Sequence, residues 1–248
     1  MSATYPSRLD QALVARGLAP SRARARALIE AGVVTVDGAP ATRPSQKAGA
    51  GAALAVTEDP CPWVSRAALK LVHALEVFDL RPEGEALDLG ASTGGFTEVL
   101  LARGAARVTA VEVGHGQMAP ALAADPRVDL REGVNARALP PDLPAPDWIV
   151  ADLSFIGLET ALPPALALAR PGAVLVALIK PQFEAGPGRV GKGGVLRDPA
   201  AHAEVRARLR DFLEGRGWAA IGEAESPIEG GSGNREFLLA ARKSASIP

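Results

Sequence analysis

The chain has 248 residues, of which 48 % are hydrophobic, and a formal net charge of -1 at pH 7. It is therefore long enough for one large domain and one small domain. Its single cysteine, Cys61, excludes an internal disulfide framework and a zinc site built from several cysteines. The sequence begins without the basic and then apolar pattern of a signal peptide, and no apolar run is long enough to span a bilayer. We therefore expect a cytoplasmic protein that binds neither a membrane nor a metal.

The net charge conceals an uneven distribution along the chain. Residues 1–58 contain seven basic and four acidic residues, whereas the remainder has four more acidic than basic residues. A basic segment joined to an acidic one is typical of an appendage that binds a polyanion. We therefore expect the small domain to occupy residues 1–58.

These first residues predict a small α+β module. The pattern indicates helices at 8–17 and 21–32, each ended by a glycine, a hairpin turning at Asp37 and Gly38, and a strand at 53–56. By themselves, the arginines of the second helix also fit an ordinary solvated helix face. However, RLDQALVARG followed by SRARARALIEAGVVTVDG resembles the S4 RNA-binding domain. The resemblance implies RNA binding around the second helix, where arginine suits contacts with phosphates and bases.

Eight basic residues are candidates for RNA contact. They lie in this module, just after the linker that follows it, and in the glycine-rich segment EAGPGRVGKGGVLRD; they are Arg8, Arg22, Arg24, Arg26, Lys47, Arg66, Arg189 and Lys192. The glycine-rich segment, at 184–198, fits a loop that closes over RNA and equally an ordinary surface loop.

A proline-rich linker is expected at 59–64, followed by a second domain at 65–248 in which helical and strand patterns alternate. The expected strands are at 85–90, 107–114, 128–133, 147–154, 173–180, 218–227 and 235–242, and the expected helices at 65–78, 96–104, 116–125, 159–170 and 198–217. This alternation predicts an α/β fold with an open, mostly parallel, doubly wound sheet.

The segment ALDLGASTGGFTEVLL places a glycine-rich loop between the first strand of this domain and its helix. Glycines let the backbone approach a ligand, and the helix offers free N–H groups. A phosphate-binding P-loop requires lysine where Phe96 stands, and a dinucleotide site prefers GxGxxG over the GxxxGG found here. An S-adenosyl-L-methionine loop fits best, which makes the sheet a Rossmann-like methyltransferase sheet.

Glu112, at the end of the second strand and twenty-two positions after Gly90, is expected to accept the ribose hydroxyls of that cofactor. Asn135 can bond the adenine edge. With the loop, the expected cofactor contacts are Gly90, Ser92, Gly94, Gly95, Glu112 and Asn135, to which the family resemblance given below adds Phe96 and Asp152.

The residues after the fourth strand discriminate between acceptor atoms. The segment ADLSF lacks the (D/N)PP(Y/F) turn that is typical of amino-group methylation, and Cys61 precedes the cofactor loop, far from the position of a pyrimidine-methylating cysteine. Methylation of a hydroxyl remains. A ribose 2′-hydroxyl is a poor nucleophile until its proton is removed or polarised.

Four residues are expected to carry that chemistry, namely Lys70, Asp152, Lys180 and Glu236. Lys180, at the end of the fifth strand, is the expected base, and Lys70 its electrostatic partner. The two carboxylates orient the ammonium groups. The plainer interpretation of each residue is a surface ion pair, but four of them at the ends of neighbouring elements favour a site.

The motifs SRAALKL, DLGASTGGFT, ADLSFI, IKPQFEAG, GGVLRDPAAH and GNREFLL resemble the TlyA-type (haemolysin A) family over nearly the full chain. That family fuses an S4 domain to an FtsJ-like methyltransferase. The resemblance implies methylation of cytidine 2′-hydroxyls in ribosomal RNA, with rRNA or ribosomal subunits as partners, a Lys-Asp-Lys-Glu tetrad at the four positions above, and the cofactor contacts already named.

The chain departs from the family at three places. Glu112 replaces the usual aspartate, residues 61–64 replace an RAWV-like linker, and Ala67 and Ala68 stand where glycine is common. Two alternatives remain open. One is a non-enzymatic RNA-binding factor for ribosome assembly, and the other is a membrane-active haemolysin. The mixed charge of the 198–217 helix argues against the second. No pattern specifies an oligomeric state or a target nucleotide.

Overall fold

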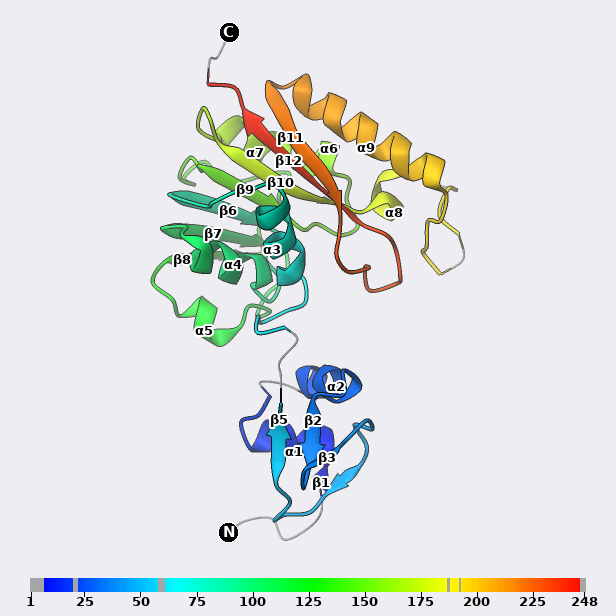
Figure 1. The fold of residues 1–248 in the computed structure, drawn as a ribbon. Helices are drawn as coiled ribbons and strands as arrows, with labels where there is room; N and C mark the ends of the chain where they lie inside the picture. The colour runs from blue at the N-terminus through cyan, green and yellow to red at the C-terminus, as the bar shows by residue number, and fades with distance from the viewer. Residues whose placement is uncertain (1–6, 20–21, 58–60, 187, 192, 246–248) are drawn as a thin grey trace. The chain divides into compact units, whose positions relative to one another are not determined.

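A computed structural model describes residues 7–19, 22–57, 61–186, 188–191 and 193–245, and these divide into two compact units, Met1–Pro62 and Trp63–Pro248 (Figure 1). Within these ranges no helix is long and apolar enough to cross a membrane, and no group of three or more His, Cys, Asp or Glu side chains is arranged to hold a metal ion.

The first unit packs two helices against short strands. Its elements are β1 (Ser7–Arg8), α1 (Leu9–Ala15), α2 (Arg22–Glu30), β2 (Val34–Val36), β3 (Ala39–Pro40), β4 (Lys47–Ala48) and β5 (Leu54–Val56). The strands form a three-stranded antiparallel sheet in the order β3-β2-β5 and a separate β1-β4 pair. Asp37 and Gly38 both have positive φ, 51° and 81°, as a two-residue hairpin requires. The predicted α+β module and its hairpin are thus confirmed.

The second unit contains one seven-stranded sheet in the order β11-β12-β10-β9-β6-β7-β8. Its strands are β6 (Glu85–Leu89), β7 (Arg107–Glu112), β8 (Val128–Glu132), β9 (Trp148–Ala151), β10 (Val174–Ile179), β11 (Trp218–Glu225) and β12 (Phe237–Lys243). Five are parallel, and β12 runs antiparallel to both β10 and β11. The strand order reverses at β6, which is paired with β7 on one side and β9 on the other. The predicted doubly wound, mostly parallel sheet is confirmed.

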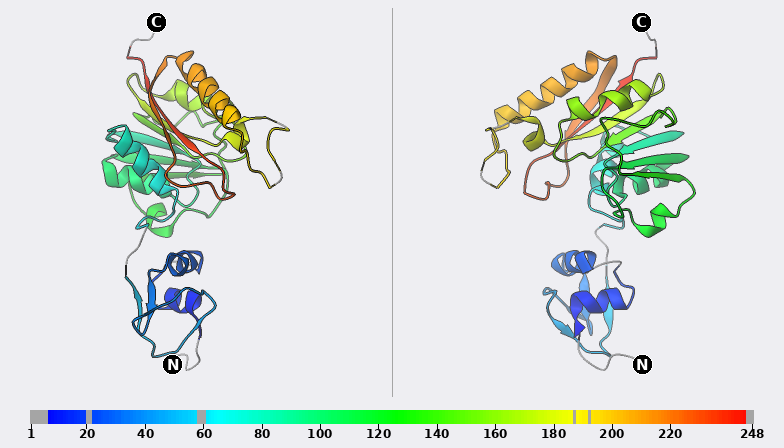
Figure 2. Two further views of the ribbon diagram at one scale, coloured as in Figure 1. Left: turned by 45° about the vertical axis from the view of Figure 1, so that its right-hand side comes forward. Right: turned by 180° about the vertical axis from the view of Figure 1, so that it is seen from behind.

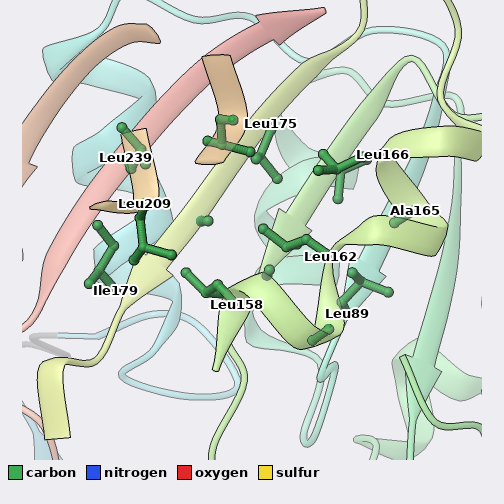
Figure 3. Close-up of a cluster of buried hydrophobic side chains, with 14 of the residues drawn as sticks. Leu89, Leu158, Leu162, Ala165, Leu166, Leu175, Ile179, Leu209 and Leu239 are labelled. Atoms are coloured by element: carbon green, nitrogen blue, oxygen red, sulfur yellow. The ribbon is translucent and has the colours of Figure 1, made fainter. Parts of the chain in front are cut away.

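Helices cover both faces of this sheet (Figures 1 and 2). They are α3 (Ala68–Val77), α4 (Gly95–Arg103), α5 (Pro120–Ala123), α6 (Leu158–Ala161), α7 (Pro163–Leu168), α8 (Pro181–Glu184) and α9 (Pro199–Glu214). α3 and α4 pack on one face, in a core that includes Leu71 and Leu100. α6, α7 and α9 pack on the other, where Leu162 and Leu209 meet side chains of the central strands (Figure 3). The sheet is therefore buried on both sides, as its continuous apolar strands require.

Three of the expected helices differ from the structure. α3 begins at Ala68 rather than at residue 65, and α5 covers only four residues of the helix expected at 116–125. The helix expected at 159–170 is two short helices, α6 and α7, which meet at Pro163. Proline has no N–H to continue the helical ladder, and its ring clashes with the preceding turn, so the chain starts a new helix there.

Candidate active site

The glycine-rich loop lies at the carboxyl edge of the sheet, directly after β6. A Cβ on Gly90 would lie 2.7 Å from the carbonyl oxygen of Asp152, and the φ of Gly90 is +83°. Gly94 also has positive φ, +94°, and a Cβ there would meet the side chain of Leu122 at 2.5 Å. Only glycine fits this backbone, because a side chain would both strain φ and push the neighbouring segment away.

Glu112 fixes the other side of this loop. It is buried at the end of β7, and its two carboxylate oxygens accept hydrogen bonds from the backbone N–H groups of Ser92 at 2.9 Å and Gly114 at 2.8 Å. Ser92 has a φ of +47°, an unusual conformation that this bond supports. Each carboxylate oxygen can accept more than one hydrogen bond, so Glu112 retains capacity for ligand hydroxyls.

A cavity of about 550 Å³ opens between Glu112 and the segment after β9. Five of the expected cofactor contacts line it, namely Gly90, Ser92, Glu112, Asn135 and Asp152. The other residues that line this cavity were not predicted from the sequence; they are Val111, Val113, Gln117, Val134, Ala136, Arg137, Leu153, Ser154, Phe155 and Ile156. The volume and the mixture of an apolar wall with a few polar groups are typical of a site for a small molecule.

A second cavity of about 240 Å³ adjoins the first and shares Gly90, Ser92, Asp152 and Ser154 with it. Gly95, Phe96 and Lys180 line only this second cavity. Gly94 lines neither cavity and contributes only through its own backbone conformation in the loop. The close approach at Gly90, the acidic group at the end of β7 and the helix start at Gly95 suit a nucleoside joined to an amino acid, which is the form of S-adenosylmethionine.

Lys180 and Asp152 form an ion pair at the wall of the second cavity. Lys180 Nζ lies 2.5 Å from Asp152 Oδ1 and donates a 2.9 Å hydrogen bond to Ser154 Oγ. Lys180 follows β10 and immediately precedes Pro181, the first residue of α8. Only 8 % of Lys180 is exposed, so its ammonium group faces the cavity and its partners rather than bulk solvent. Ser154 was not predicted, although it lies in the ADLSF segment.

Lys70 and Glu236 form a second ion pair, which is more deeply buried. Lys70 Nζ of α3 donates to Glu236 Oε2 at 2.5 Å, and Glu236 immediately precedes β12. Gly230 packs against Glu236 so closely that a Cβ would overlap its carboxylate. The glycine-rich turn before β12 therefore makes room for this carboxylate.

The register of the sheet brings the two ion pairs to the same edge. Ile179 of β10 pairs with Phe237 of the antiparallel β12, so the next residue of one strand, Lys180, stands opposite the preceding residue of the other, Glu236. The parallel β9 ends beside β10, which places Asp152 at this edge as well. The structure therefore gathers the four expected residues, but as two pairs. Asp152 lines both cavities and Lys180 the smaller one, whereas Lys70 and Glu236 line neither.

Asp88 lies beneath the cofactor loop and was missed in the sequence. It is fully buried on β6, and its Oδ2 accepts a 2.7 Å hydrogen bond from Thr97 Oγ1 of α4. Burial raises the pKa of the Asp88 carboxyl to about 7, with the negative charges of Asp152 and Glu112 acting in the same direction and the Thr97 bond opposing them. The pair Asp88–Thr97 joins the strand before the loop to the helix after it.

The segment after β9 carries an exposed aromatic ring at the cavity. Phe155 is 90 % exposed, has a φ of +63°, and lies with its ring centroid 4.9 Å from that of Phe183. The following residues are held by Glu184, whose buried carboxylate accepts a 2.8 Å hydrogen bond from the N–H of Leu158. Burial raises the pKa of Glu184. Positive φ is a rarely populated conformation for a residue other than glycine, so Phe155 combines backbone strain with an exposed ring at the cavity.

The expected RNA-binding residues of the first unit are partly exposed. Arg8, Arg22 and Arg26 surround the buried carboxylate of Asp10, and Arg24 donates to the carbonyl of Cys61. Lys47 is exposed on β4, opposite Arg8 in the β1-β4 pair.

In the second unit Arg66 is exposed between Ser65 and Ala67, two residues that line the smaller cavity. Arg189 is exposed and forms a 2.8 Å ion pair with Glu204. Lys192 lies outside the described residues.

Comparison with known proteins gives a consistent result. Residues 63–243 match the model of the FtsJ-like methyltransferase family, and residues 7–54 match that of the S4 domain. The chain is 49 % identical to the 16S/23S rRNA (cytidine-2′-O)-methyltransferase TlyA of Mycobacterium tuberculosis, over 94 % of this chain and 88 % of that protein. It is 36 % identical to Hemolysin A of Brachyspira hyodysenteriae, over 93 % of this chain and 98 % of that protein.

A solved structure titled "Putative hemolysin from Streptococcus thermophilus" is 37 % identical, covers 98 % of this chain and 90 % of its own, and superposes with a TM-score of 0.76. The methyltransferase match identifies S-adenosylmethionine as the cofactor. Because the matches span both units and nearly the full chain, the protein belongs to the TlyA-type (haemolysin A) family, in which an S4 domain precedes an FtsJ-like methyltransferase domain.

Proposed function

We propose that the protein methylates the 2′-hydroxyl of a cytidine in ribosomal RNA, in the cytoplasm, with Lys180 as the general base. The observation that carries the chemical part is the Lys180–Asp152 ion pair at the wall of a cavity that adjoins the cofactor loop. The choice of cytidine and of ribosomal RNA rests on the relative from M. tuberculosis, whose name states that substrate.

The residues that line the larger cavity would hold the cofactor. Glu112 would accept the ribose hydroxyls, Asn135 would lie at the adenine, and the Gly90 backbone would allow close approach. S-adenosylmethionine, when bound, supplies a methyl group activated by the positive charge of its sulfonium. The Asn135 side-chain oxygen accepts from the N–H of Arg137 at 3.0 Å, which would leave the side-chain nitrogen to donate to an adenine acceptor.

Lys180 is placed to take the proton of the nucleophile. A 2′-hydroxyl in the smaller cavity would give its proton to Lys180 Nζ as its oxygen forms the bond to the methyl carbon and the carbon–sulfur bond breaks. A lysine can accept this proton only in its neutral form, so the proton that Lys180 holds in its ion pair would first have to pass to Asp152 or to solvent. Asp152 and Ser154 would fix the direction of Nζ, while the Lys70–Glu236 pair would hold α3 against the residue before β12. Positioning of this kind contributes much of the rate in a displacement at a bound methyl group.

The exposed ring of Phe155 suits a nucleobase. RNA enzymes that act on an unpaired nucleotide hold its base by stacking on aromatic side chains. Phe155 lines the larger cavity and projects 90 % of its surface into solvent, so it would support the base while the ribose enters the smaller space. The S4 domain would supply the remaining affinity for the RNA.

Methyl transfer to ribosomal RNA tests this proposal directly. Purified protein, labelled S-adenosylmethionine and ribosomal subunits from a strain that lacks the gene should yield methylated rRNA. Nuclease digestion and mass spectrometry should then place one methyl group on the ribose of a cytidine. Binding of rRNA without any transferred methyl group would favour the assembly-factor alternative. Label on a base, or on a nucleoside other than cytidine, would contradict the assignment of the acceptor.

A further inference from the structure

The three half-exposed arginines of the S4 domain share one buried carboxylate. Asp10, in the first turn of α1, is completely inaccessible to solvent, whereas the side chains of Arg8, Arg22 and Arg26 are 38 %, 54 % and 52 % exposed. Arg22 and Arg26 lie four positions apart on α2, and Arg8 comes from β1. The three cations therefore reach Asp10 from two elements and form one surface group, called here the arginine cluster.

The hydrogen bonds of Asp10 fix where these guanidinium groups point. Arg8 binds in a fork, with Nε 3.0 Å from Oδ1 and Nη2 3.2 Å from Oδ2. Oδ2 also accepts from Arg22 Nη2 at 3.2 Å and from Arg26 Nε at 3.4 Å. The Arg8 bond first, and then those from Arg22, hold the pKa of the Asp10 carboxyl well below its usual range. Asp10 is thus ionised at any physiological pH and remains the negative group to which the three arginines bind.

The cluster still has donors to offer a polyanion. A guanidinium carries five N–H donors, and Asp10 uses only one each from Arg22 and Arg26. One carboxylate among three cations also leaves two positive charges. An unsupported arginine loses rotamer freedom when a ligand immobilises it. A guanidinium that is already fixed avoids most of that loss.

We propose that Asp10 is a positioning residue for RNA binding, which holds the arginine cluster in the arrangement that meets the phosphate backbone. This inference rests on the RNA-binding part of the proposed function. The positioning role predicts the opposite of what charge alone predicts for the removal of Asp10. If Asp10 only neutralised positive charge, its removal would strengthen RNA binding. If it orients the cluster, its removal weakens binding although the domain becomes more basic.

Asp10→Asn separates these two outcomes, and Asp37→Asn is its matched control. Both substitutions remove one negative charge from the same domain. Asp37 stands in the β2-β3 hairpin, where its side chain accepts from the N–H of Ala53 at 2.7 Å, a bond that asparagine can keep. Full-length protein is titrated against a fluorescently labelled fragment of ribosomal RNA at several salt concentrations.

We expect Asp10→Asn to weaken RNA binding about tenfold, as the rotamer cost of two or three released arginines implies, and Asp37→Asn to leave it unchanged or slightly stronger. The apparent KM for rRNA should rise in Asp10→Asn, while kcat and cofactor affinity stay unchanged. Equal or tighter binding of Asp10→Asn would overturn the proposal.

The double variant Arg22→Gln/Arg26→Gln tests the underlying function separately. If it binds RNA as tightly as the wild type, the cluster is not an RNA surface at all. If it binds weakly while Asp10→Asn binds normally, only the positioning role fails.

A measurement on the unaltered protein covers the case in which Asp10→Asn does not fold. Nuclear magnetic resonance of arginine Nε–H groups should show slow solvent exchange for Arg8 and Arg26 before RNA is added, and changed signals after it. Exchange as fast as that of Arg43, which is exposed in the same domain, would also overturn the proposal.

Discussion

Lys70 Nζ and Glu236 Oε2 lie 2.5 Å apart, although 166 positions separate the two residues in the chain. The pair joins a helix at the start of the methyltransferase domain to its last strand. The neighbouring pair, Lys180 and Asp152, lies at the cavity wall. The two ion pairs therefore differ in position: Lys180 and Asp152 line a cavity, whereas Lys70 and Glu236 do not.

Removal of Lys180 should abolish catalysis without loss of the cofactor. We expect Lys180→Ala to lower kcat by about 10² to 10⁴, the usual contribution of a general base, while calorimetry finds S-adenosylmethionine affinity largely unchanged. Lys180→Arg is the informative control, because arginine preserves the charge beside Asp152 but cannot act as a base. An active Lys180→Arg enzyme would assign Lys180 an electrostatic role instead.

Ser154 should affect turnover through its hydrogen bond to Lys180. Ser154→Ala removes the oxygen that lies 2.9 Å from Lys180 Nζ, so we expect kcat to fall about tenfold, as for a lost hydrogen bond to a charged group. The pH–rate profile should shift with it. Ser154→Thr keeps the hydroxyl and should restore most of the activity. Unaltered kcat and profile in Ser154→Ala would make this bond incidental.

Breakage of the buried Lys70–Glu236 pair should reduce stability. Either Lys70→Met or Glu236→Gln leaves one charge without its partner, which costs about 3 to 5 kcal/mol in a buried site. The double variant has no unpaired charge and should regain most of this free energy of unfolding. Urea denaturation, followed in the methyltransferase unit, measures the three values. Additive losses in the double variant would show that the two side chains do not stabilise each other.

Glu112→Gln should weaken cofactor binding. The amide keeps one acceptor but presents an N–H₂ group to one of the two backbone N–H donors, Ser92 or Gly114, that the carboxylate now accepts from. Loss of a charge-assisted bond predicts an affinity about 10- to 100-fold lower by calorimetry. Glu132→Gln makes the same chemical change at the end of β8, where Glu132 accepts from the N–H of Gly116 at 2.6 Å and lines neither cavity. Similar losses in both variants would remove Glu112 from the cofactor site.

Asp88 should make stability depend on pH. Its pKa is about 7 in the folded protein and near 3.8 in an unfolded chain, so between these values the folded state holds a proton that the unfolded state has lost. Its contribution to stability is therefore largest below about pH 4 and declines until pH 7, by at most about 4 kcal/mol.

Asp88→Asn does not titrate and still accepts from Thr97. Its free energy of unfolding should match that of the wild type near pH 4 and exceed it at pH 8. Parallel pH curves for the two proteins would contradict the raised pKa.

The sequence predicted those parts of the site that depend on one element at a time. The glycine loop, the carboxylate at the end of β7 and the residues at strand ends follow from periodicity and spacing, because the parallel strands of one sheet end at a common edge. The pairing of Lys70 with Glu236 and of Lys180 with Asp152 did not follow. The first depends on where β12 enters the sheet beside β10, and the second on the parallel pairing of β9 with β10; no local pattern encodes either.

Asp10 and Asp88 were not predicted for a similar reason, because their partners lie on other elements of the fold. Asp10 is an ordinary helix aspartate until α1 and α2 pack together. In the sequence Asp88 is a single polar residue in a buried strand. Only the fold shows that Thr97 of the next helix donates a hydrogen bond to it. The break at Pro163, by contrast, was available from the sequence, since proline rarely continues a helix. The prediction of one helix at 159–170 relied on the spacing of apolar residues and overlooked this proline.

The position of β12 between β10 and β11 ties activity to completion of the sheet. The last strand of the sheet enters the gap between two earlier ones, and only then does Glu236 reach Lys70. A folding intermediate without β12 would expose two strand edges and lack one of the four site residues. We therefore expect a chain that has lost β12 to lack both the completed sheet and the Lys70–Glu236 pair.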